Sequence, residues 1–572
     1  MQRAPDGWHE LALPELGAGA RYQFLLRDGT RVPDPASRFQ PDDVLGPSEV
    51  IAYNTYEWRD RGWLGRPWHT AVLYELHVGT FTPEGTFLGV IGKLDYLVEL
   101  GVTALQIMPI ADFPGRRNWG YDGVFPYACE SSYGRPEDLK RLVDEAHARG
   151  LMVLLDVVYN HFGPEGNFLS QYAAKFFTSR HKTPWGDAVN FDGPESAPVR
   201  QFFIDSAVRW IEEFHFDGLR LDAVHAIVDD SELHFLDELA GRVREAAPGR
   251  QVHLILENEE NQASRLRRSG SNRPLTYTAQ WNDDVHHVLH VMATGEACGY
   301  YEDYAGDTEK LGRALAEGFA FQGEMMRFRK SPRGEASWFL PPAAFVAFIQ
   351  NHDQIGNRAR GERLSQLTTA EARRAVAAIY LLLPQIPMLF MGEEWDCEQP
   401  FPFFCDFKGE LGEAVRKGRR AEFAHLPEFS ADGGESQVPD PLSEETFRSA
   451  CLTWNALYQS HHADWLQGYR QLLATRRAEI LPRLTQLSGS ESSYLVHGEG
   501  AVTVQWLGQD GILLELNANL SARPAADFLR RDGRTVWLEG GRSDDGSVQP
   551  WTVQWVVVDA NANPAGKRHA LA

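Results

Sequence analysis

The middle of the chain repeats one order of hydrophobic and polar positions: a short apolar run, a loop, and an amphipathic segment. Short apolar runs bounded by turn residues are typical of buried parallel strands. The predicted strands span residues 72–78, 103–109, 151–158, 217–223, 252–258, 277–281, 345–351 and 387–393. Eight strands with helical segments between them favour a closed (β/α)8 barrel over an open sheet.

The segments between these strands carry the period of a helix. Residues 136–150 begin with acidic side chains and end at Gly150, as helices commonly do. Four apolar side chains recur on one face of this helix: Leu139, Leu142, Val143 and Ala146. A single apolar face suits a helix that covers the outside of a barrel. We therefore predict the fold class α/β, with a (β/α)8 TIM barrel as the main domain.

The pattern changes at both ends of this barrel. Residues 1–57 hold short β-like pieces between turn-forming residues, too few for a stable sandwich. They predict either the remnant of an N-terminal β-sandwich with its linker or an arm packed on the barrel. Residues 486–572 alternate apolar and polar positions in short runs, which predicts a C-terminal antiparallel β-sandwich. The barrel, with loop insertions and extra helices, then takes residues 58–485.

Composition and charge exclude several classes of function. A formal net charge of −23 opposes binding to nucleic acid or to anionic membranes, which need a concentrated basic face. The 43% of hydrophobic and 24% of charged residues are typical of a globular protein, and no apolar run is long enough to span a membrane. The first residues lack a signal-peptide pattern. We expect a cytoplasmic protein that acts on an uncharged substrate.

The cysteines give no sign of a disulfide framework or a metal centre. The five of them, Cys129, Cys298, Cys397, Cys405 and Cys451, form no CxxC pair. An odd, scattered set in a long chain is typical of reduced thiols. We expect neither disulfides nor a zinc site.

Carboxylates stand at the carboxyl ends of four predicted strands: Asp156, Asp222, Glu257 and Asp353. In a (β/α)8 barrel this end of the strands forms the active-site face. One such residue alone would equally fit a helix N-cap. Four on one rim repel one another, and enzymes tolerate this cost because two carboxylates with separated pKa values can serve as nucleophile and acid.

Arg220 and Asp222 lie two positions apart on one predicted strand. Residues two apart face the same side of a strand, so both point into the barrel while Leu219 and Leu221 point toward the helices. The guanidinium would keep Asp222 ionised and oriented, as a nucleophile requires. A purely structural buried pair is the alternative.

The stretch HLILENEENQ, residues 253–262, offers three glutamates after a strand. Glu257 is the first carboxylate at the strand end, where it can face Asp222. Glu259 shares that facing only if the strand continues, and Glu260 fits a solvated loop charge. By position, Glu257 is the first candidate for a catalytic acid and Glu259 is the reserve.

Four stretches on the third, fourth, fifth and seventh predicted strands occur in a fixed order: DVVYNH (156–161), GLRLDAVH (218–225), the strand ending at Glu257, and QNHDQIGN (350–357). Together they resemble the four ordered regions of the α-amylase superfamily, glycoside hydrolase family 13. The resemblance implies that Asp222 is the nucleophile, that Glu257 is the general acid and base, and that Asp353 grips sugar hydroxyls. It implies hydrolysis with retention, carboxyl groups roughly 5 Å apart, and a higher pKa for Glu257 than for Asp222.

The same resemblance implies a set of substrate-binding residues: Tyr121, His161, Arg220, His225 and His352, with Asp156 as a supporting acid. Tyr121, in the stretch NWGYDG, resembles a tyrosine that stacks under the sugar ring at the cleavage point. His225 corresponds to a position beyond that point. The resemblance implies no cofactor and no metal.

Longer stretches, such as QWNDDVHHVLHVMATGE and NHDQIGNRARGERLS, are similar to the maltooligosyltrehalose trehalohydrolases within this superfamily. The similarity implies cleavage of the α-1,4 bond next to the terminal trehalose of maltooligosyltrehalose, with a maltooligosyltrehalose synthase as the pathway partner that makes this substrate. Two features depart from the family pattern. We expect only the final portion of the family's N-terminal sandwich, through either a misassigned start or a shortened domain. In addition, Leu256 stands directly before Glu257, where we expect its side chain to point away from the site.

Two alternatives remain open from the sequence. A glycogen branching enzyme shares the four regions but transfers the glycosyl group to a sugar hydroxyl. A non-catalytic carbohydrate-binding protein can share the barrel, because fold does not determine function. Such proteins typically lose a catalytic carboxylate, whereas this chain keeps Asp222, Glu257 and Asp353.

Overall fold

The computed structural model describes residues 1–4, 9–52, 55–184, 186–270, 272–424, 438–528, 531–544 and 546–558. Its centre is a closed barrel of eight parallel strands, which follow one another around the barrel in chain order. These strands are β7 (Leu73–Leu76), β8 (Ala104–Ile107), β11 (Met152–Val157), β14 (Gly218–Leu221), β15 (His253–Leu256), β16 (Ala279–Trp281), β19 (Phe345–Ala347) and β20 (Ile386–Phe390). Each lies in or overlaps one of the eight predicted stretches, so the predicted barrel is confirmed.

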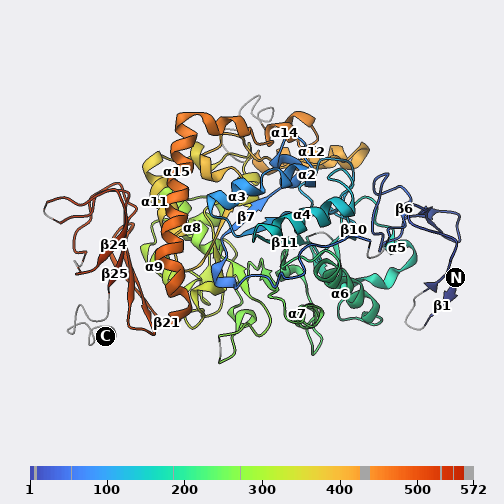
Figure 1. Ribbon diagram of the computed structural model, residues 1–572, viewed down its shortest axis with the longest axis horizontal. Helices are drawn as coiled ribbons and strands as arrows, with labels where there is room; N and C mark the ends of the chain where they lie inside the picture. Colours follow the sequence, from blue (N-terminus) through green and yellow to red (C-terminus); the bar gives the residue numbers. More distant parts are fainter. Residues whose placement is uncertain are drawn as a thin grey trace.

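Helices surround the barrel (Figure 1). The longer ones are α3 (Leu94–Leu100), α4 (Pro136–Ala148), α6 (Ala197–Glu212), α7 (Phe235–Ala246), α8 (Asp283–Thr294), α9 (Thr308–Glu317), α11 (Ala370–Tyr380), α12 (Gly409–Phe423) and α15 (Ser460–Thr475). The shorter α1 (Val78–Phe81), α2 (Phe87–Ile91), α5 (Leu169–Tyr172), α10 (His352–Gly356) and α14 (Glu444–Ser449) lie in the connections. Helix α4 buries the apolar face expected from its sequence, including Leu139 and Val143.

Side chains of the barrel strands divide between two apolar clusters, as their alternation requires. Leu154, Ile255 and Trp281 belong to a cluster inside the barrel. Leu221 and Leu256 belong to the cluster shared with the surrounding helices. The expected outward direction of Leu256 is therefore confirmed, and its bulk does not intrude on the carboxyl group of Glu257.

Three hairpins interrupt the connections of the barrel. Strands β9 (Ala111–Asp112) and β10 (Phe125–Cys129) follow β8, and β12 (Phe177–Thr183) and β13 (Gly186–Val189) follow β11. Strands β17 (Met325–Met326) and β18 (Ser331–Pro332) follow α9. Each connection adds side chains to the face of the barrel where the strands end.

The N-terminal residues form three small two-stranded sheets. They pair β1 (Gln2–Arg3) with β2 (His9–Glu10), β3 (Arg21–Tyr22) with β6 (Ser48–Glu49), and β4 (Phe24–Leu25) with β5 (Arg31–Val32). This segment contacts the barrel domain directly: Val44 packs on Phe125, and Arg135 donates a 2.6 Å hydrogen bond to Glu49. Figure 1 places it at the end of the molecule opposite the C-terminal sheet.

The C-terminal region forms one five-stranded antiparallel sheet in the order β21-β22-β23-β25-β24. Its strands are β21 (Leu487–Gly498), β22 (Ala501–Gly508), β23 (Leu513–Asn519), β24 (Arg534–Glu539) and β25 (Thr552–Val558). The antiparallel strands are confirmed, but the described residues supply no second sheet to complete a sandwich. The sheet packs on α9 and α11 instead, where Trp555 donates a 2.9 Å hydrogen bond to the carbonyl of Ala378.

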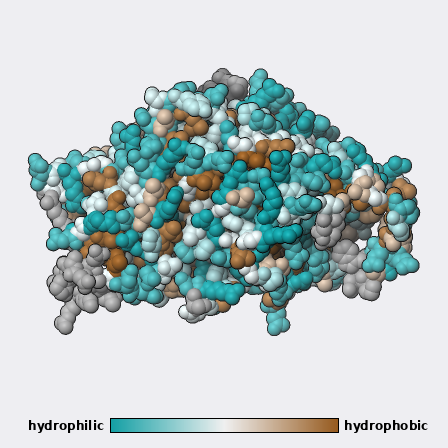
Figure 2. Space-filling view, in the orientation of Figure 1, coloured by the Kyte–Doolittle hydropathy of each residue, from teal (hydrophilic) through white to brown (hydrophobic). Residues whose placement is uncertain are grey.

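The surface agrees with the composition. Figure 2 shows a largely hydrophilic face with small, separate apolar areas. Among the described residues, no helix is long and apolar enough to cross a membrane. Parts of the predicted terminal domains, residues 559–572 above all, lie outside the described residues.

Candidate active site

Arg220 stands at the centre of a group of carboxylates where the strands end. Its side chain is fully buried in the barrel, as the alternation along β14 requires. One guanidinium nitrogen lies 2.7 Å from Asp156 and 2.9 Å from Asp222, and the other lies 2.7 Å from Glu257. A single cation thus contacts three carboxylates that three different strands deliver. Without it their mutual repulsion in a buried site would be costly.

Trp281, the last residue of β16, covers the guanidinium. The carbon centre of the guanidinium lies 4.1 Å from the centroid of the indole ring, within the range of a cation–π contact. Both side chains are almost completely buried. The indole therefore closes the floor of the site and keeps water away from the ion pairs.

Asp222 is oriented by two further groups. The side-chain amide of Asn160 donates a 3.0 Å hydrogen bond to its second carboxylate oxygen, and the backbone N–H of Asp222 donates to Val157 at 3.0 Å. With Arg220 on the other oxygen, both carboxylate oxygens have a donor. This carboxylate is 11% exposed, so it remains open to the cleft.

Glu257 follows the last residue of β15 and faces the same guanidinium. Its Oε2 accepts from Arg220 at 2.7 Å and from the backbone N–H of Ala223 at 2.9 Å. Ala223 has a φ of 38°, in the left-handed region that non-glycine residues seldom occupy, and strain of this kind clusters at functional sites. Burial and the neighbouring Asp222 raise the pKa of Glu257, although Arg220 opposes the shift.

Asp156 is the buried carboxylate of the group. Burial and the charge of Asp222 raise its pKa to about 7, against the pull of Arg220. Its second oxygen also accepts a 2.8 Å hydrogen bond from the hydroxyl of Tyr121. Asp156 is 2% exposed, so it supports Arg220 and Tyr121 from behind.

His352 and Asp353 begin α10 on the opposite side of the rim. The Nε2 atom of His352 lies 3.5 Å from Asp353, and its Nδ1 lies 2.7 Å from Glu75 on β7. The backbone N–H of His352 also donates to Glu75, at 3.1 Å. Asp353 is the more accessible carboxylate, with 34% of its side chain exposed, and partial burial raises its pKa.

Tyr121 and His161 form the remaining wall. The rings of Tyr121 and His352 are stacked, with centroids 5.0 Å apart and planes 23° apart. The Nε2 atom of His161 lies 3.0 Å from the carbonyl of Tyr121, and its Nδ1 contacts Asn160. Through these contacts, the loops after β8, β11 and β19 meet around the opening of the active site.

His225 joins the site through the segment after Glu257. The backbone N–H of Glu259 lies 3.5 Å from its Nδ1 atom. Strand β15 ends at Leu256, so the side chain of Glu259 is not held on the strand face and is 57% exposed. Glu260 pairs with Arg329 at the surface. Of the three glutamates, only Glu257 contacts Arg220.

Three residues of the site were not among the sequence candidates: Glu75, Asn160 and Trp281. Glu75 is fully buried and positions His352. The sequence feature that could have identified it is an acidic residue at an inward position of an otherwise apolar strand. Asn160 lies within the quoted stretch DVVYNH, but its contact with Asp222 depends on how β11 and β14 pair.

The ion pair between His352 and Glu75 predicts a loss of stability at high pH. Burial alone would lower the pKa of His352, but the negative charges of Asp353 and Glu75 raise this pKa from 6.5 to about 9. The resulting stabilisation, roughly 3 kcal/mol, is fully present below pH 6.5 and disappears as the pH rises through 9. We expect the difference in melting temperature between the wild type and His352→Gln to shrink between about pH 6 and pH 10. A pH-independent difference would contradict this assignment.

Outside the group around Arg220, His181, Asp192 and Asp230 bring one potential metal ligand each within 4.8 Å of one another. Arg180 already pairs with both carboxylates, and His181 lies 2.8 Å from Asp192. These contacts account for the cluster without an ion.

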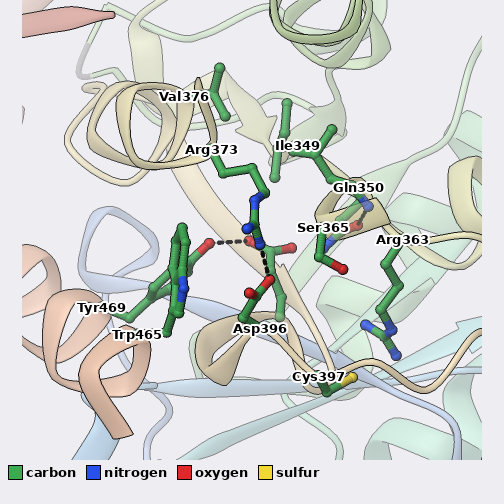
Figure 3. A pocket seen from close by; sticks show the side chains of 12 residues that line it. Ile349, Gln350, Arg363, Ser365, Arg373, Val376, Asp396, Cys397, Trp465 and Tyr469 are labelled. Carbon is green, nitrogen blue, oxygen red and sulfur yellow. Dashed lines mark hydrogen bonds and ion pairs between the residues drawn. The ribbon is translucent and has the colours of Figure 1, made fainter. Parts of the chain in front are cut away.

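A cavity of about 20 Å³ lies behind the end of β19 (Figure 3). Its lining includes Gln350, Arg363, Glu393 and Tyr469, and the hydroxyl of Tyr469 donates to Glu393 at 3.1 Å. A space of this size holds about one water molecule. The cavity is therefore too small for a sugar, and its lining does not include the carboxylates around Arg220.

Comparison with known proteins decides the family. A protein from Deinococcus radiodurans, named malto-oligosyltrehalose trehalohydrolase, is 44% identical over 529 residues, which cover 89% of this chain and 84% of that protein. One of the same name from Saccharolobus solfataricus is 41% identical over 531 residues, covering 92% and 90%. The chain belongs to the malto-oligosyltrehalose trehalohydrolase family.

This member of the trehalohydrolase family also matches two protein-family models and a solved structure. Residues 54–187 match the α-amylase catalytic domain, and residues 489–555 match a domain of unknown function. A crystal structure of a putative α-amylase from Salmonella typhimurium superposes with a TM-score of 0.93 at 44% identity, covering 98% of this chain and 94% of that one. The chain is a glycoside hydrolase of family 13 with a TIM barrel.

Proposed function

We propose that this chain hydrolyses the α-1,4-glucosidic bond adjacent to the terminal trehalose of maltooligosyltrehalose and releases α,α-trehalose. The observation that carries the proposal is the similarity, over most of both chains, to proteins named malto-oligosyltrehalose trehalohydrolase. The arrangement of Asp222 and Glu257 supports it, because both carboxyl groups lie within 2.9 Å of one guanidinium and retaining glycosidases use two neighbouring carboxyl groups as nucleophile and acid.

Asp222 is the proposed nucleophile. It attacks the anomeric carbon and forms a covalent glycosyl-enzyme, while the bond to the leaving oxygen breaks. Arg220 and Asn160 hold its two oxygens, so the carboxylate does not have to reorganise during the attack. Its partial exposure leaves room for the sugar.

Glu257 is the proposed general acid and base. Because its Oε2 already accepts hydrogen bonds from Arg220 and Ala223, the catalytic proton belongs on Oε1. The raised pKa keeps Glu257 protonated until Asp222 attacks, and the proton then passes from Oε1 to the leaving oxygen as the glycosidic bond breaks. After the leaving group departs, the same carboxylate removes a proton from water, which cleaves the glycosyl-enzyme with retention.

The surrounding side chains are the proposed sugar contacts. Asp353 offers an accessible carboxylate to ring hydroxyls, and His352, held by Glu75, is a donor at the same ring. The ring of Tyr121 suits the apolar face of a pyranose. His161 completes the set at the cleavage point, whereas Arg220, which is fully buried, acts on the sugar through the carboxylates that it holds, with Asp156 as its support. His225, next to the segment after Glu257, is the proposed contact on the leaving-group side.

The substrate implies a preceding reaction. A chain that ends in trehalose must be made by an enzyme that rearranges the reducing end of a maltooligosaccharide. We propose a maltooligosyltrehalose synthase as the pathway partner.

The proposed reaction predicts a specific product. Incubation with maltotriosyltrehalose is expected to release trehalose and maltotriose in equal amounts, because the cleaved bond lies next to the terminal trehalose. Chromatography of the products with authentic standards measures both. The initial product of retaining hydrolysis is the α-anomer, which proton NMR of early time points distinguishes.

This assay and a second one with amylose separate the alternatives. New α-1,6 branches in amylose, without release of trehalose, would identify a branching enzyme and refute the proposal. Binding of the oligosaccharide without turnover would identify a non-catalytic protein. Both assays use the full chain.

A further inference from the structure

A buried ion pair lies beneath the segment that follows Glu257. Asp284, in the first turn of α8, is fully buried, and Arg333, just after β18, is 4% exposed. Their side chains are 2.8 Å apart, and the hydroxyl of Tyr304 contacts both. The second oxygen of Asp284 accepts backbone N–H groups from Ala320 and Phe321, at 2.7 and 3.2 Å.

This ion pair holds residues 258–261 from below. The Nε of Arg333 donates to the carbonyl of Glu259 at 2.8 Å. The amide of Asn261 donates to Asp284 at 3.0 Å. Gln280, on β16, donates to the carbonyl of Asn258 at 3.1 Å. The segment directly after Glu257 therefore has its backbone fixed by buried side chains from other parts of the chain.

The backbone of the segment needs this support. Asn261 has a φ of 49°, in the left-handed region, where its side chain reaches both Asp284 and Gln280. The carbonyl of Glu259 also accepts a 3.0 Å hydrogen bond from the more exposed Arg329. Two arginines of one hairpin thus converge on a single carbonyl, two residues beyond Glu257.

Stability alone does not explain such an arrangement. The cost of removing two charges from water can exceed the attraction between them, so a buried ion pair is weak evidence for a stabilising role. Its geometry, by contrast, is strict: a planar guanidinium donates in fixed directions, whereas an ammonium does not. The residues are therefore better suited to setting a position than to adding stability.

We propose that Arg333, backed by Asp284, is a positioning residue for Glu257. It holds the carbonyl of Glu259 and thereby the segment that begins at the catalytic acid, on the side where the leaving group departs. The inference rests on the proposed role of Glu257 as the general acid. It assigns no contact with substrate to Arg333.

The test compares a substrate that needs protonation with one that does not. Arg333→Lys keeps the charge beside Asp284 but loses the directed Nε donor. We expect kcat/KM for maltotriosyltrehalose to fall on the order of 10- to 100-fold, because a small displacement of a catalytic group has effects of this size. The value of kcat/KM with α-maltosyl fluoride is expected to stay near that of the wild type, since it reports formation of the glycosyl-enzyme, in which fluoride departs without a general acid.

A matched control is Arg313→Lys. Arg313 contacts Glu324 at the base of the same hairpin and donates to Ala320 at 3.2 Å, away from Glu259. This variant is expected to behave like the wild type with both substrates. Equal losses for Arg333→Lys with both substrates, or no loss with either, would overturn the inference, because a merely structural role does not distinguish leaving groups.

A second variant protects the test against misfolding. Asn261→Gly keeps the left-handed backbone accessible but removes the link to Asp284. If Arg333→Lys does not melt cooperatively, the same selective loss is expected for Asn261→Gly, and its absence would contradict the inference.

Failure of the proposed function gives a different result. If the wild type cleaves maltodextrin but releases no trehalose from maltotriosyltrehalose, the substrate assignment is wrong. The ratio between maltodextrin and α-maltosyl fluoride then tests the role of Arg333 in the same way.

Discussion

Asp222→Ala is expected to abolish hydrolysis of maltotriosyltrehalose, with kcat reduced about 10⁴- to 10⁶-fold, the range that loss of a covalent nucleophile causes in other hydrolases. Alanine removes the only group proposed to attack the anomeric carbon. Arg220 keeps Asp156 and Glu257 as partners, so the variant should fold and bind the substrate. Trehalose release, melting temperature and substrate affinity by calorimetry measure the three consequences.

The control for this variant is Asp230→Ala. Asp230 belongs to the connection after β14, but 65% of its side chain is exposed, and this side chain pairs with Arg180 and His181 rather than with the group around Arg220. Its removal is expected to leave turnover unchanged. If Asp222→Ala retained wild-type turnover, another group would have to be the nucleophile.

Glu257→Gln is expected to lower kcat for maltotriosyltrehalose by about 10²- to 10⁴-fold, the usual contribution of general acid and base catalysis. Glutamine preserves the shape of the side chain but has no proton to donate. Hydrolysis of α-maltosyl fluoride should still form the glycosyl-enzyme, because its first step needs no acid. Its second step needs a base, so added azide is expected to accelerate turnover and give an azide of retained configuration.

The pH dependence of kcat/KM tests the role of Glu257 independently. The acid must be protonated in the free enzyme, so the alkaline limb of the kcat/KM profile reports the pKa of Glu257. Because burial raises this pKa, we expect the limb to lie above the ordinary range of a glutamate. The kcat/KM profile for α-maltosyl fluoride should lack this alkaline limb. A wild-type profile that is the same for both substrates would mean that Glu257 is not the acid; Glu259→Gln would then test the reserve candidate.

Arg220 explains why these carboxylates can act together. Its single charge lies within hydrogen-bonding distance of Asp156, Asp222 and Glu257, so protonation of one changes the field at the other two. Burial raises the pKa of Asp156 to about 7, while Glu257 is also shifted upward. The site is therefore a coupled group of acids around one cation, and the two catalytic roles depend on where the protons lie.

Local alternation made the centre of the site predictable. Arg220 and Asp222 point the same way because they are two apart on a strand, and Leu256 points outward because it is one residue from Glu257. The positions of the carboxylates at strand ends placed them on one face of the barrel. These relations span a few residues or follow from the barrel, so they hold before any tertiary contact is known.

The C-terminal region shows where local patterning stops being informative. A strand with one buried face alternates in the same way whether that face meets another sheet or a helix. The sequence predicted a sandwich on this basis. In the described residues, the sheet packs on α9 and α11, so helices of the barrel domain, and not a second sheet, cover its buried face.

The sequence by itself thus determined the eight strands, the directions of Arg220, Asp222 and Leu256, and the order of the carboxylates along the rim. Only the tertiary structure decided which groups pair. Glu75 and His352 meet across 277 positions of the chain, and Arg333 reaches Glu259 across 74. Such contacts depend on closure of the barrel and on the path of its connections, which no periodicity records. The physical reason is that strand alternation is a local property, whereas charge pairing in a buried site is decided by which elements the fold brings together.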